Sequence, residues 1–265
     1  MNVPDRTDRS EVAPDGVAPS PPVAMYVHVP FCISVCPYCD FVVLAGSAAR
    51  GPRSRMGAFL AAVRTEIDLR ADAADARFGS PGSPARPPLE TLYIGGGTPS
   101  LVPPDELARL VELVASRFRL AAGAEITLEA NPGADERGDP AAQRRAGINR
   151  LSLGAQSLDR GELRRLGRRH RPEDIPDSVA AAQAAAMPSV SLDLLYDIPD
   201  QSIGSWMTTL ELVLALAPDH LSLYALTLDD PDSEGLTGPG GDHLPTSAGA
   251  RRGRSRAWRT AGRLG

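Results

Sequence analysis

The chain contains no lysine, so all 28 of its basic residues are arginine. This absence excludes a lysine Schiff base and a Walker-type phosphate loop, because both depend on a lysine side chain. The 33 acidic residues outnumber the arginines and leave a net charge of −5. A chain with this balance has no overall positive charge that would attract it to nucleic acid or to an anionic membrane surface.

Long apolar runs are absent as well. No stretch approaches the roughly 20 apolar residues that a membrane-spanning helix needs. Residues 1–22 contain five prolines and no apolar segment, which is against a secretory signal. We therefore expect a cytoplasmic protein with no membrane span and no nucleic-acid partner.

Cysteine is scarce, and its distribution is the most informative feature of the chain. The three cysteines all lie within residues 32–39, with the spacing C-x3-C-x2-C. An odd, clustered set argues against a disulfide framework and agrees with a reducing compartment. A structural zinc site needs four ligands, usually on two paired arms, and no second arm follows. A redox dithiol would use Cys36 and Cys39 but would leave Cys32 unexplained.

A third interpretation uses all three cysteines, and we favour it over the zinc site and the dithiol. Three thiolates on one loop can hold three corners of a cubane iron–sulfur cluster. The fourth iron then has no protein ligand and is free to bind a small molecule and pass it an electron. The sequence therefore favours an iron–sulfur site with one open iron.

The middle of the chain alternates short apolar strands with amphipathic helices. Regular alternation of this kind implies an α/β fold with a parallel sheet and helices outside it. Six units are fewer than a complete eight-unit barrel of about 250 residues contains, so we predict an open, partial (β/α)6 barrel of the TIM type. The site is expected at the carboxyl ends of the strands. Strands are predicted at 25–29, 91–94, 125–130, 150–153, 190–196 and 220–226, and helices at 56–71, 104–118, 139–146, 159–166 and 202–216.

The composition also divides the chain into a core and two tails. Residues 1–24 are rich in proline and aspartate and are predicted to be disordered. The core is predicted to span residues 25–228. Residues 229–265 break the pattern with glycine and arginine, and we expect a disordered tail there in preference to a nucleic-acid-binding arm. The composition of this tail also suggests a shifted reading frame or a truncated product.

The residues around the cysteines form a pattern that resembles a known family. The pattern consists of YVHVPFC at 26–32 and CPYCDF at 36–41. In content and order, these and the stretches after them resemble the radical S-adenosylmethionine (SAM) superfamily. The similarity is to its HemN/HemW branch of oxygen-independent coproporphyrinogen III oxidases and related haem chaperones, and it covers about residues 25–228. The further stretches are YIGGGTPS at 93–100, EANPG at 129–133, AGINRLSLGAQS at 146–157, LRRLGR at 163–168 and LDLLY at 192–196.

The resemblance implies cofactors and roles for individual residues. Cys32, Cys36 and Cys39 would ligate a [4Fe-4S] cluster, and SAM would bind the open iron through its amino and carboxylate groups. One electron would then cleave SAM to methionine and a 5′-deoxyadenosyl radical. The other matched residues share an implied contact with SAM. They are Tyr38 near the adenine, Gly96, Gly97 and Thr98 in the glycine motif, Glu129 and Arg168 at the aminoacyl end, Gln156 and Asp193 at the ribose, and Tyr26 beside the cofactor or substrate.

Several of these residues also have a purely structural interpretation. The glycines could form a plain tight turn, although glycines after a strand also let backbone N–H groups approach a charged ligand. Glu129 could be a solvated strand end, and Arg168 one charge in an arginine run. Asp193 could cap a turn, but its apolar neighbours suggest a buried carboxylate that needs partners. Tyr26 could be an ordinary core aromatic residue.

Three departures from the family pattern shape the expected function. The oxidases carry a further cysteine where this chain has Phe41, which is the pattern of the haem chaperones. Asp197 stands where the family usually has glycine. From the resemblance we also expect the chain to stop before the family's C-terminal domain, and the haem-linked His-Asn…Tyr-Trp motif is absent from it.

These departures rank the functions that the resemblance implies. We expect a haem chaperone of porphyrin and haem metabolism, with haem and a haem-acceptor protein as partners. One alternative is a coproporphyrinogen III oxidase, whose substrate would be the porphyrinogen. The other is a fragment that binds the cluster and SAM without a downstream activity.

Overall fold

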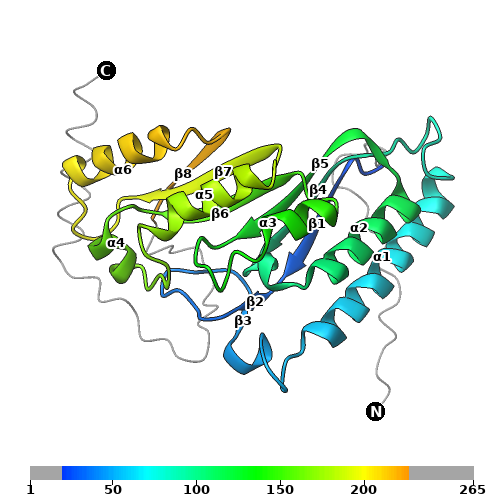
Figure 1. Ribbon diagram of the computed structural model, residues 1–265. Helices are drawn as coiled ribbons and strands as arrows, with labels where there is room; N and C mark the ends of the chain where they lie inside the picture. The colour runs from blue at the N-terminus through cyan, green and yellow to red at the C-terminus, as the bar shows by residue number, and fades with distance from the viewer. Residues whose placement is uncertain (1–19, 227–265) are drawn as a thin grey trace, which may run out of the picture.

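The computed structural model describes residues 20–226 (Figure 1). Our predictions for residues 1–19 and 227–265, including most of both tails, lie outside the described residues. Strand β1 begins at Ala24, which the composition had assigned to the N-terminal tail. The carbonyl oxygen of Val23 already accepts a hydrogen bond from the amide of Glu90 at 2.7 Å. Pairing with the neighbouring strand therefore extends the fold slightly beyond the predicted boundary.

Six parallel strands form one open sheet, in the order β1-β4-β5-β6-β7-β8. Each strand pairs with the next strand of this sheet along the chain, and within residues 20–226 β1 and β8 are the two edges. The predicted open, partial barrel with six strands is confirmed. The strands are β1 (Ala24–Val29), β4 (Leu89–Gly96), β5 (Leu120–Ala130), β6 (Arg150–Gln156), β7 (Ser189–Tyr196) and β8 (His220–Ala225).

Helices connect these strands and lie on one side of the sheet (Figure 1). Helix α2 shows why they form: proline occupies its first turn together with two acidic residues, which favour a helix N-terminus. Its buried residues Leu107, Leu110 and Val114 share one face and pack into the core. The helices are α1 (Met56–Phe78), α2 (Pro104–Phe118), α3 (Pro140–Arg145), α4 (Arg160–Arg165), α5 (Asp174–Ala184) and α6 (Ile203–Ala215), with short 3-10 turns η1 (Gly46–Ala48) and η2 (Pro99–Leu101).

The two faces of the sheet differ in chemical character because side chains alternate along each strand. On β4, Leu92 and Ile94 are fully buried in the hydrophobic core beneath the helices. Tyr93 lies between them and points to the opposite face. A complete barrel fills its interior with branched aliphatic side chains, whereas this face offers hydrogen-bonding groups to a ligand. Its polar side chains include Tyr93, Glu129, Ser152 and Asp193.

Two parts of the fold were not predicted. Helix α5 occupies a stretch that we had left unassigned, although Ile175, Val179 and Ala182 have helical spacing and are buried. The second is a pair of two-residue strands, β2 (Phe31–Cys32) and β3 (Leu44–Ala45), which is too short to leave a periodic signal. This pair closes the base of the cysteine loop.

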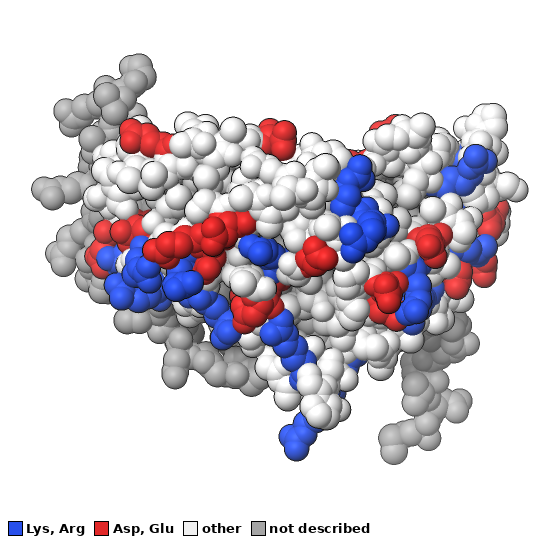
Figure 2. Space-filling model, viewed as in Figure 1, with Lys and Arg blue, Asp and Glu red and all other residues white. Residues whose placement is uncertain are grey.

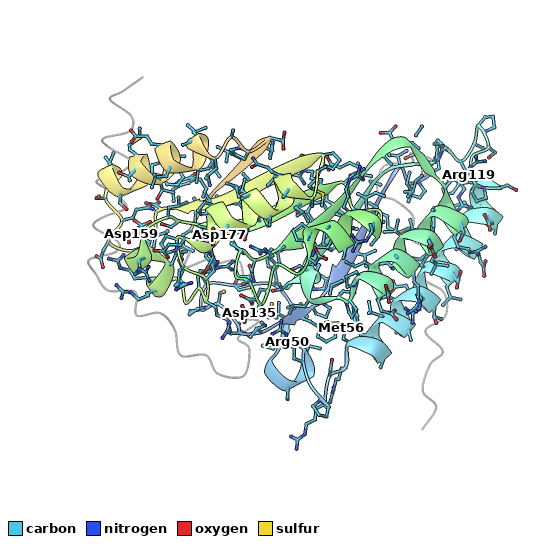
Figure 3. All side chains as sticks on the ribbon, in the orientation of Figure 1. Arg50, Met56, Arg119, Asp135, Asp159 and Asp177 are labelled. Atoms are coloured by element: carbon cyan, nitrogen blue, oxygen red, sulfur yellow. The ribbon has the colours of Figure 1, made fainter. Side chains whose placement is uncertain are left out.

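The cysteine loop is anchored to the rest of the fold on both sides. Phe31 is fully buried and packs edge-on against Phe59 of α1, with ring centroids 5.4 Å apart. On the other side of the loop, Arg50 donates a hydrogen bond to the backbone carbonyl of Asp135, which follows β5 (Figure 3). His28 of β1 contacts the carbonyl oxygen of Val42 through Nε2 at 2.9 Å. These contacts fix the loop against the end of the sheet.

The surface carries both signs of charge. Acidic and basic side chains are interspersed over the face shown in Figure 2. Within residues 20–226, no helix combines the length and the apolar character that crossing a membrane would require.

Candidate cofactor-binding site

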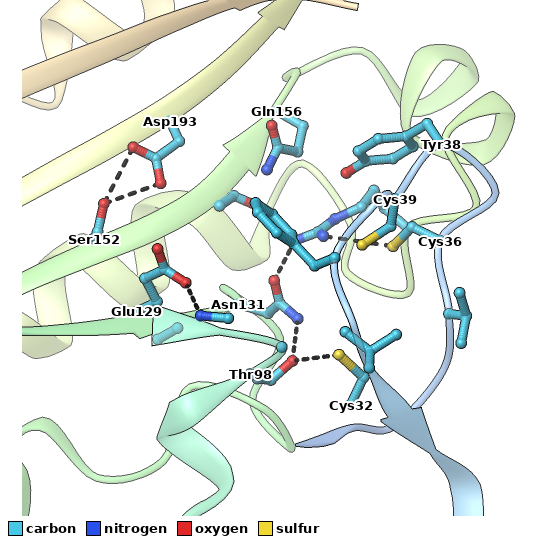
Figure 4. Close-up of a pocket in the computed structure, with 18 of the residues that line it drawn as sticks. Cys32, Cys36, Tyr38, Cys39, Thr98, Glu129, Asn131, Ser152, Gln156 and Asp193 are labelled. Carbon is cyan, nitrogen blue, oxygen red and sulfur yellow. Dashed lines mark hydrogen bonds between the residues drawn. The ribbon is translucent and has the colours of Figure 1, made fainter. Parts of the chain in front are cut away.

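A cavity of about 280 Å³ lies beside the cysteine loop, where strands β4 to β7 end (Figure 4). All but one of the residues predicted to bind the cluster or SAM line it. They come from separate segments, which the parallel sheet brings to one edge. The residues are Cys32, Cys36, Tyr38, Cys39, Gly96, Gly97, Thr98, Glu129, Gln156, Arg168 and Asp193.

The three cysteines are free thiols, each partly exposed. Burial raises the pKa of Cys32 to about 11, although a hydrogen bond from Thr98 acts in the opposite direction. Burial also raises the pKa of Cys39. Because a thiolate is the form that binds a metal, loading the site would release protons.

The sulfurs are not arranged around one point. Within residues 20–226, no three His, Cys, Asp or Glu side chains converge as closely as a single metal ion requires. In a cubane cluster each thiolate binds a different iron, so the sulfurs do not have to converge.

Two polar groups reach the cysteine sulfurs from other parts of the fold. Thr98 Oγ1 donates to Cys32 Sγ at 3.6 Å, and Arg168 Nη1 donates to Cys36 Sγ at 3.7 Å. Asn131 lies between these two donors and is hydrogen-bonded to both (Figure 4). A continuous hydrogen-bonded chain therefore joins two of the three cysteines.

The backbone N–H groups of the glycine motif at the end of β4 are used inside the protein, so a contact of Gly96, Gly97 or Thr98 with the ligand stays a prediction. We predicted backbone N–H groups that approach a charged ligand, but all three donate within the protein. The N–H of Gly96 binds Glu129 Oε2 at 2.8 Å, that of Gly97 binds the carbonyl of Val29, and that of Thr98 binds the carbonyl of Phe31. The turn therefore holds the cysteine loop and β1 against β4.

Gly97 is required by close packing. A Cβ at this position would lie 2.9 Å from Cys32 Sγ and 2.7 Å from the carbonyl oxygen of Phe31. The neighbouring Gly96 has a φ of +119°, which side-chain-bearing residues rarely adopt.

The sheet forms one wall of the cavity, and two carboxylates lie on this wall. Glu129 at the end of β5 accepts a hydrogen bond from Tyr93 Oη at 2.8 Å. Asp193 of β7 accepts one from Ser152 Oγ at 3.0 Å. Burial raises the pKa of both carboxyl groups above their ordinary values, more than their hydrogen bonds lower it. Both carboxylates therefore bind protons more tightly than exposed ones do.

Two further predicted residues complete the lining. Gln156 ends β6 at an irregularity in its pairing with β7, and its positive φ of 66° turns the side chain into the cavity (Figure 4). The ring of Tyr38 packs against a small apolar cluster, and burial raises the pKa of its hydroxyl to about 12. It supplies an aromatic surface directly beside Cys39.

Tyr26 is the predicted site residue that does not line this cavity. Its ring is stacked on Tyr93 at 6.0 Å between centroids, and its hydroxyl contacts His28 Nδ1 at 3.0 Å. The side chain is 55% exposed and borders a neighbouring groove between β1 and α1. A contact between Tyr26 and the ligand of the main cavity therefore stays a prediction.

Comparison with known proteins agrees with this geometry. The model of the radical SAM superfamily matches residues 26–213, which is most of the chain and includes every cavity residue that we predicted. The chain belongs to the radical SAM superfamily. Membership implies a [4Fe-4S] cluster and SAM as its cofactors.

Among curated proteins, this radical SAM chain is similar to haem chaperones. It is 36% identical to the heme chaperone HemW of Escherichia coli over 209 residues, which cover 79% of this chain and 52% of that protein. It is 39% identical to the radical S-adenosyl methionine domain-containing protein 1 of Bos taurus mitochondria, covering 82% of this chain and 46% of the relative. The chain therefore spans about half the length of these relatives.

A solved structure is similar too. Coproporphyrinogen III oxidase (HemN) from Escherichia coli aligns with a TM-score of 0.66 and 30% sequence identity, over 80% of this chain and 46% of that one. This chain again spans a little less than half of the matched protein.

The residues present fit the two cofactors that the superfamily uses. Three free thiols, for a cluster, and two carboxylates, for ligand hydroxyl or ammonium groups, border the same space. Arg168 lines this space as well, and its Nε is buried with no hydrogen-bond partner among the described residues. A buried guanidinium with an unused donor is suited to an anionic ligand such as a carboxylate.

Sequence analysis missed three polar residues of the site. Asn131, Ser152 and Tyr93 all line the cavity and bind predicted residues. Ser152 had a usable signal, because it is a polar residue inside an otherwise apolar strand. Asn131 follows the end of a strand, and its partners became visible only in three dimensions.

The close packing at Gly97 leads to a direct prediction. Gly97→Ala is expected to push Cys32 away from its position and to lower the iron content of the reconstituted protein, because disturbing the surroundings of metal ligands typically lowers metal affinity by roughly 10- to 100-fold. Iron analysis after anaerobic reconstitution measures this. Gly57→Ala in α1 is the matched control, because nothing lies within 4 Å of a Cβ there. Equal iron content in both variants would contradict the packing argument.

Proposed function

We propose that this chain is the radical SAM core of a haem chaperone, with a [4Fe-4S] cluster on Cys32, Cys36 and Cys39. The observation that carries the proposal is the convergence of these free thiols with polar residues from four strands on one cavity. The bound cluster would supply the electron for reductive cleavage of SAM. The residues of the chain position the ligand.

The cavity residues divide the binding of SAM between them. Arg168 would attract the carboxylate of the aminoacyl end, and Glu129 would accept hydrogen bonds from its ammonium group. Asp193 and Gln156 are placed for the ribose hydroxyls, since an ionised carboxylate can accept two hydrogen bonds. Tyr38 offers a ring for the adenine.

These carboxylates make binding dependent on pH. Burial raises the pKa of Glu129 and Asp193, and a ligand that donates hydrogen bonds prefers the ionised forms. Affinity for SAM is therefore expected to be full at neutral pH and to fall as the pH drops through the raised pKa values. These lie above the ordinary values of 4.5 and 3.8.

Asp193→Asn tests this dependence. We expect the variant to bind SAM about 10- to 100-fold more weakly at neutral pH, because hydrogen bonds to a charged group are worth about 1.5–3 kcal/mol. It should also lose the part of the pH dependence that Asp193 contributes. Equilibrium binding between pH 4 and 8, roughly the range in which such groups titrate, measures both effects. An unchanged affinity and profile would contradict the assignment of Asp193.

Two observations favour the haem chaperone over the porphyrinogen oxidase: the identity of residue 41 and the names of similar curated proteins. Phe41 lines the cavity in the position where the oxidases carry a further cysteine. Several similar curated proteins are named heme chaperones. Haem is thus proposed as the molecule carried, and an acceptor protein as its destination, in a cytoplasmic setting.

Two measurements test the proposal. The first is the electron paramagnetic resonance spectrum of the anaerobically reconstituted, reduced protein with and without SAM. A [4Fe-4S] signal that changes with SAM supports the open-iron site, and an indifferent or absent signal contradicts it. The second compares haem titration with coproporphyrinogen III turnover. Stoichiometric haem binding supports the chaperone, decarboxylation supports the oxidase, and neither result supports a core fragment without downstream activity.

A further inference from the structure

Asn131 connects Arg168 to Cys32 through hydrogen bonds that all point the same way (Figure 4). Arg168 Nη2 donates to Asn131 Oδ1, and Asn131 Nδ2 donates to Thr98 Oγ1 at 3.1 Å. The hydroxyl of Thr98 then donates to Cys32 Sγ at 3.6 Å. Each acceptor along this chain is also the next donor, so each bond polarises and strengthens the following one.

The orientation of the Asn131 amide is fixed by its neighbours. Arg168 has only donors, so it must face the amide oxygen. The carboxylate of Glu136 is an acceptor, and its Oε1 lies 3.5 Å from Asn131 Nδ2. The –NH₂ group therefore faces Thr98, and the Thr98 hydroxyl, which accepts from it, has its own proton free for Cys32.

A single cation thus acts on two cysteines. Arg168 Nη1 donates directly to Cys36 Sγ at 3.7 Å, while Nη2 serves the chain that ends at Cys32. The guanidinium is held in place by the carbonyl oxygen of Gly154, which accepts from Nη2 at 2.7 Å. Hydrogen bonds to cluster sulfurs are among the main determinants of the reduction potential of iron–sulfur proteins.

We propose that Asn131 is a positioning residue that sets the reduction potential of the cluster, by directing the Thr98 hydroxyl onto the Cys32 sulfur. This inference rests on the proposed cluster at these cysteines. Donors to a thiolate sulfur stabilise the reduced cluster, because reduction adds negative charge to it. The relay through Asn131 therefore favours the reduced state.

Asn131→Asp separates this role from simple packing, because the two side chains have nearly the same shape. The introduced carboxylate still accepts from Arg168 but has no donor for Thr98. The Thr98 hydroxyl is then expected to reverse and to donate to this carboxylate instead of to Cys32. Thr98→Val removes the same hydrogen bond without adding charge, and Thr98→Ser keeps the hydroxyl.

The experiment is a redox titration of the reconstituted proteins, followed by electron paramagnetic resonance. We expect Asn131→Asp and Thr98→Val to lower the equilibrium constant for reduction about tenfold, which is about 59 mV for one electron. Thr98→Ser should stay close to the wild type, and Thr98→Val should add little in the Asn131→Asp background. If the Asn131→Asp protein binds no cluster, the reduction potential of Thr98→Val decides whether the hydrogen bond to Cys32 matters.

The possible failures are distinguishable. A wild-type protein that holds a cluster, with unchanged potentials in Asn131→Asp and Thr98→Val, overturns this inference and leaves the proposed function standing. The inference is also overturned if Thr98→Ser lowers the reduction potential of the cluster as much as Thr98→Val does, because the hydroxyl would then be irrelevant. A wild-type protein that forms no cluster overturns the inference and the proposed function together.

Discussion

Cys36→Ala is expected to remove the cluster completely, together with any spectroscopic response to SAM. With one thiolate gone, only two protein ligands remain on the loop, and one further iron loses its anchor. Cys36 also receives a hydrogen bond from Arg168, so the substitution leaves this cation without its sulfur partner. Iron and sulfide analysis after anaerobic reconstitution measures the loss, with electron paramagnetic resonance as the second readout.

Val42→Ala provides the matched control for this result. Val42 belongs to the same loop and is 66% exposed. Its backbone carbonyl is used by His28, and the substitution keeps that carbonyl. The control should therefore retain the cluster, whereas a stable, SAM-responsive cluster in Cys36→Ala would mean that the ligands have been misassigned.

Arg168→Met is expected to have the largest effect on folding stability among substitutions at the site. The change leaves Asn131 Oδ1 and the carbonyl of Gly154 without the donor that both now share. An unsatisfied buried acceptor costs about 1–3 kcal/mol, so we expect the free energy of unfolding to fall by about 2–4 kcal/mol. Denaturant unfolding of the cluster-free protein measures this directly, independently of any cofactor.

The control for this prediction lies in the same arginine run. Arg164 is exposed, and its substitution by methionine should change stability by no more than about 0.5 kcal/mol. If Arg164→Met and Arg168→Met were equally stable, the buried network around Arg168 would contribute nothing. We also expect Arg168→Met to weaken SAM binding, because the cavity would lose its cation.

The fold was largely predictable because its pattern is local. Helix α2 matches its predicted bounds at both ends, since proline, an apolar face and a terminal arginine are readable from the sequence. Strand β5 instead begins at Leu120, well before the predicted start. Its first residue pairs with Leu89, and such long-range pairing leaves no local signal. The Ala-rich helix α5 was missed because alanine contributes little to an amphipathic pattern.

The sequence predicted most of the residues that line the cavity, but few of the contacts between them. The run from Arg164 to Arg171 gave no physical reason to separate Arg168 from its neighbours, and the resemblance alone selected it. The structure supplies the reason, because Arg168 turns inward to Asn131 while Arg169 pairs with Asp135. The backbone bonds of the glycine turn depend on the chain segment that packs against it, and no motif encodes that partner.

The absence of the three cysteines from the hydrophobic core bears on how this protein can mature. The core lies under the helices, on the face of the sheet away from the cavity, and none of the three cysteines belongs to it. We therefore expect the scaffold to fold without metal, in contrast to small zinc domains that are unfolded without it. Biogenesis can proceed in two stages, with a finished scaffold that receives iron and sulfide afterwards. On the same reasoning, we expect a protein that has lost its cluster to oxidation to keep its fold and to accept a new cluster.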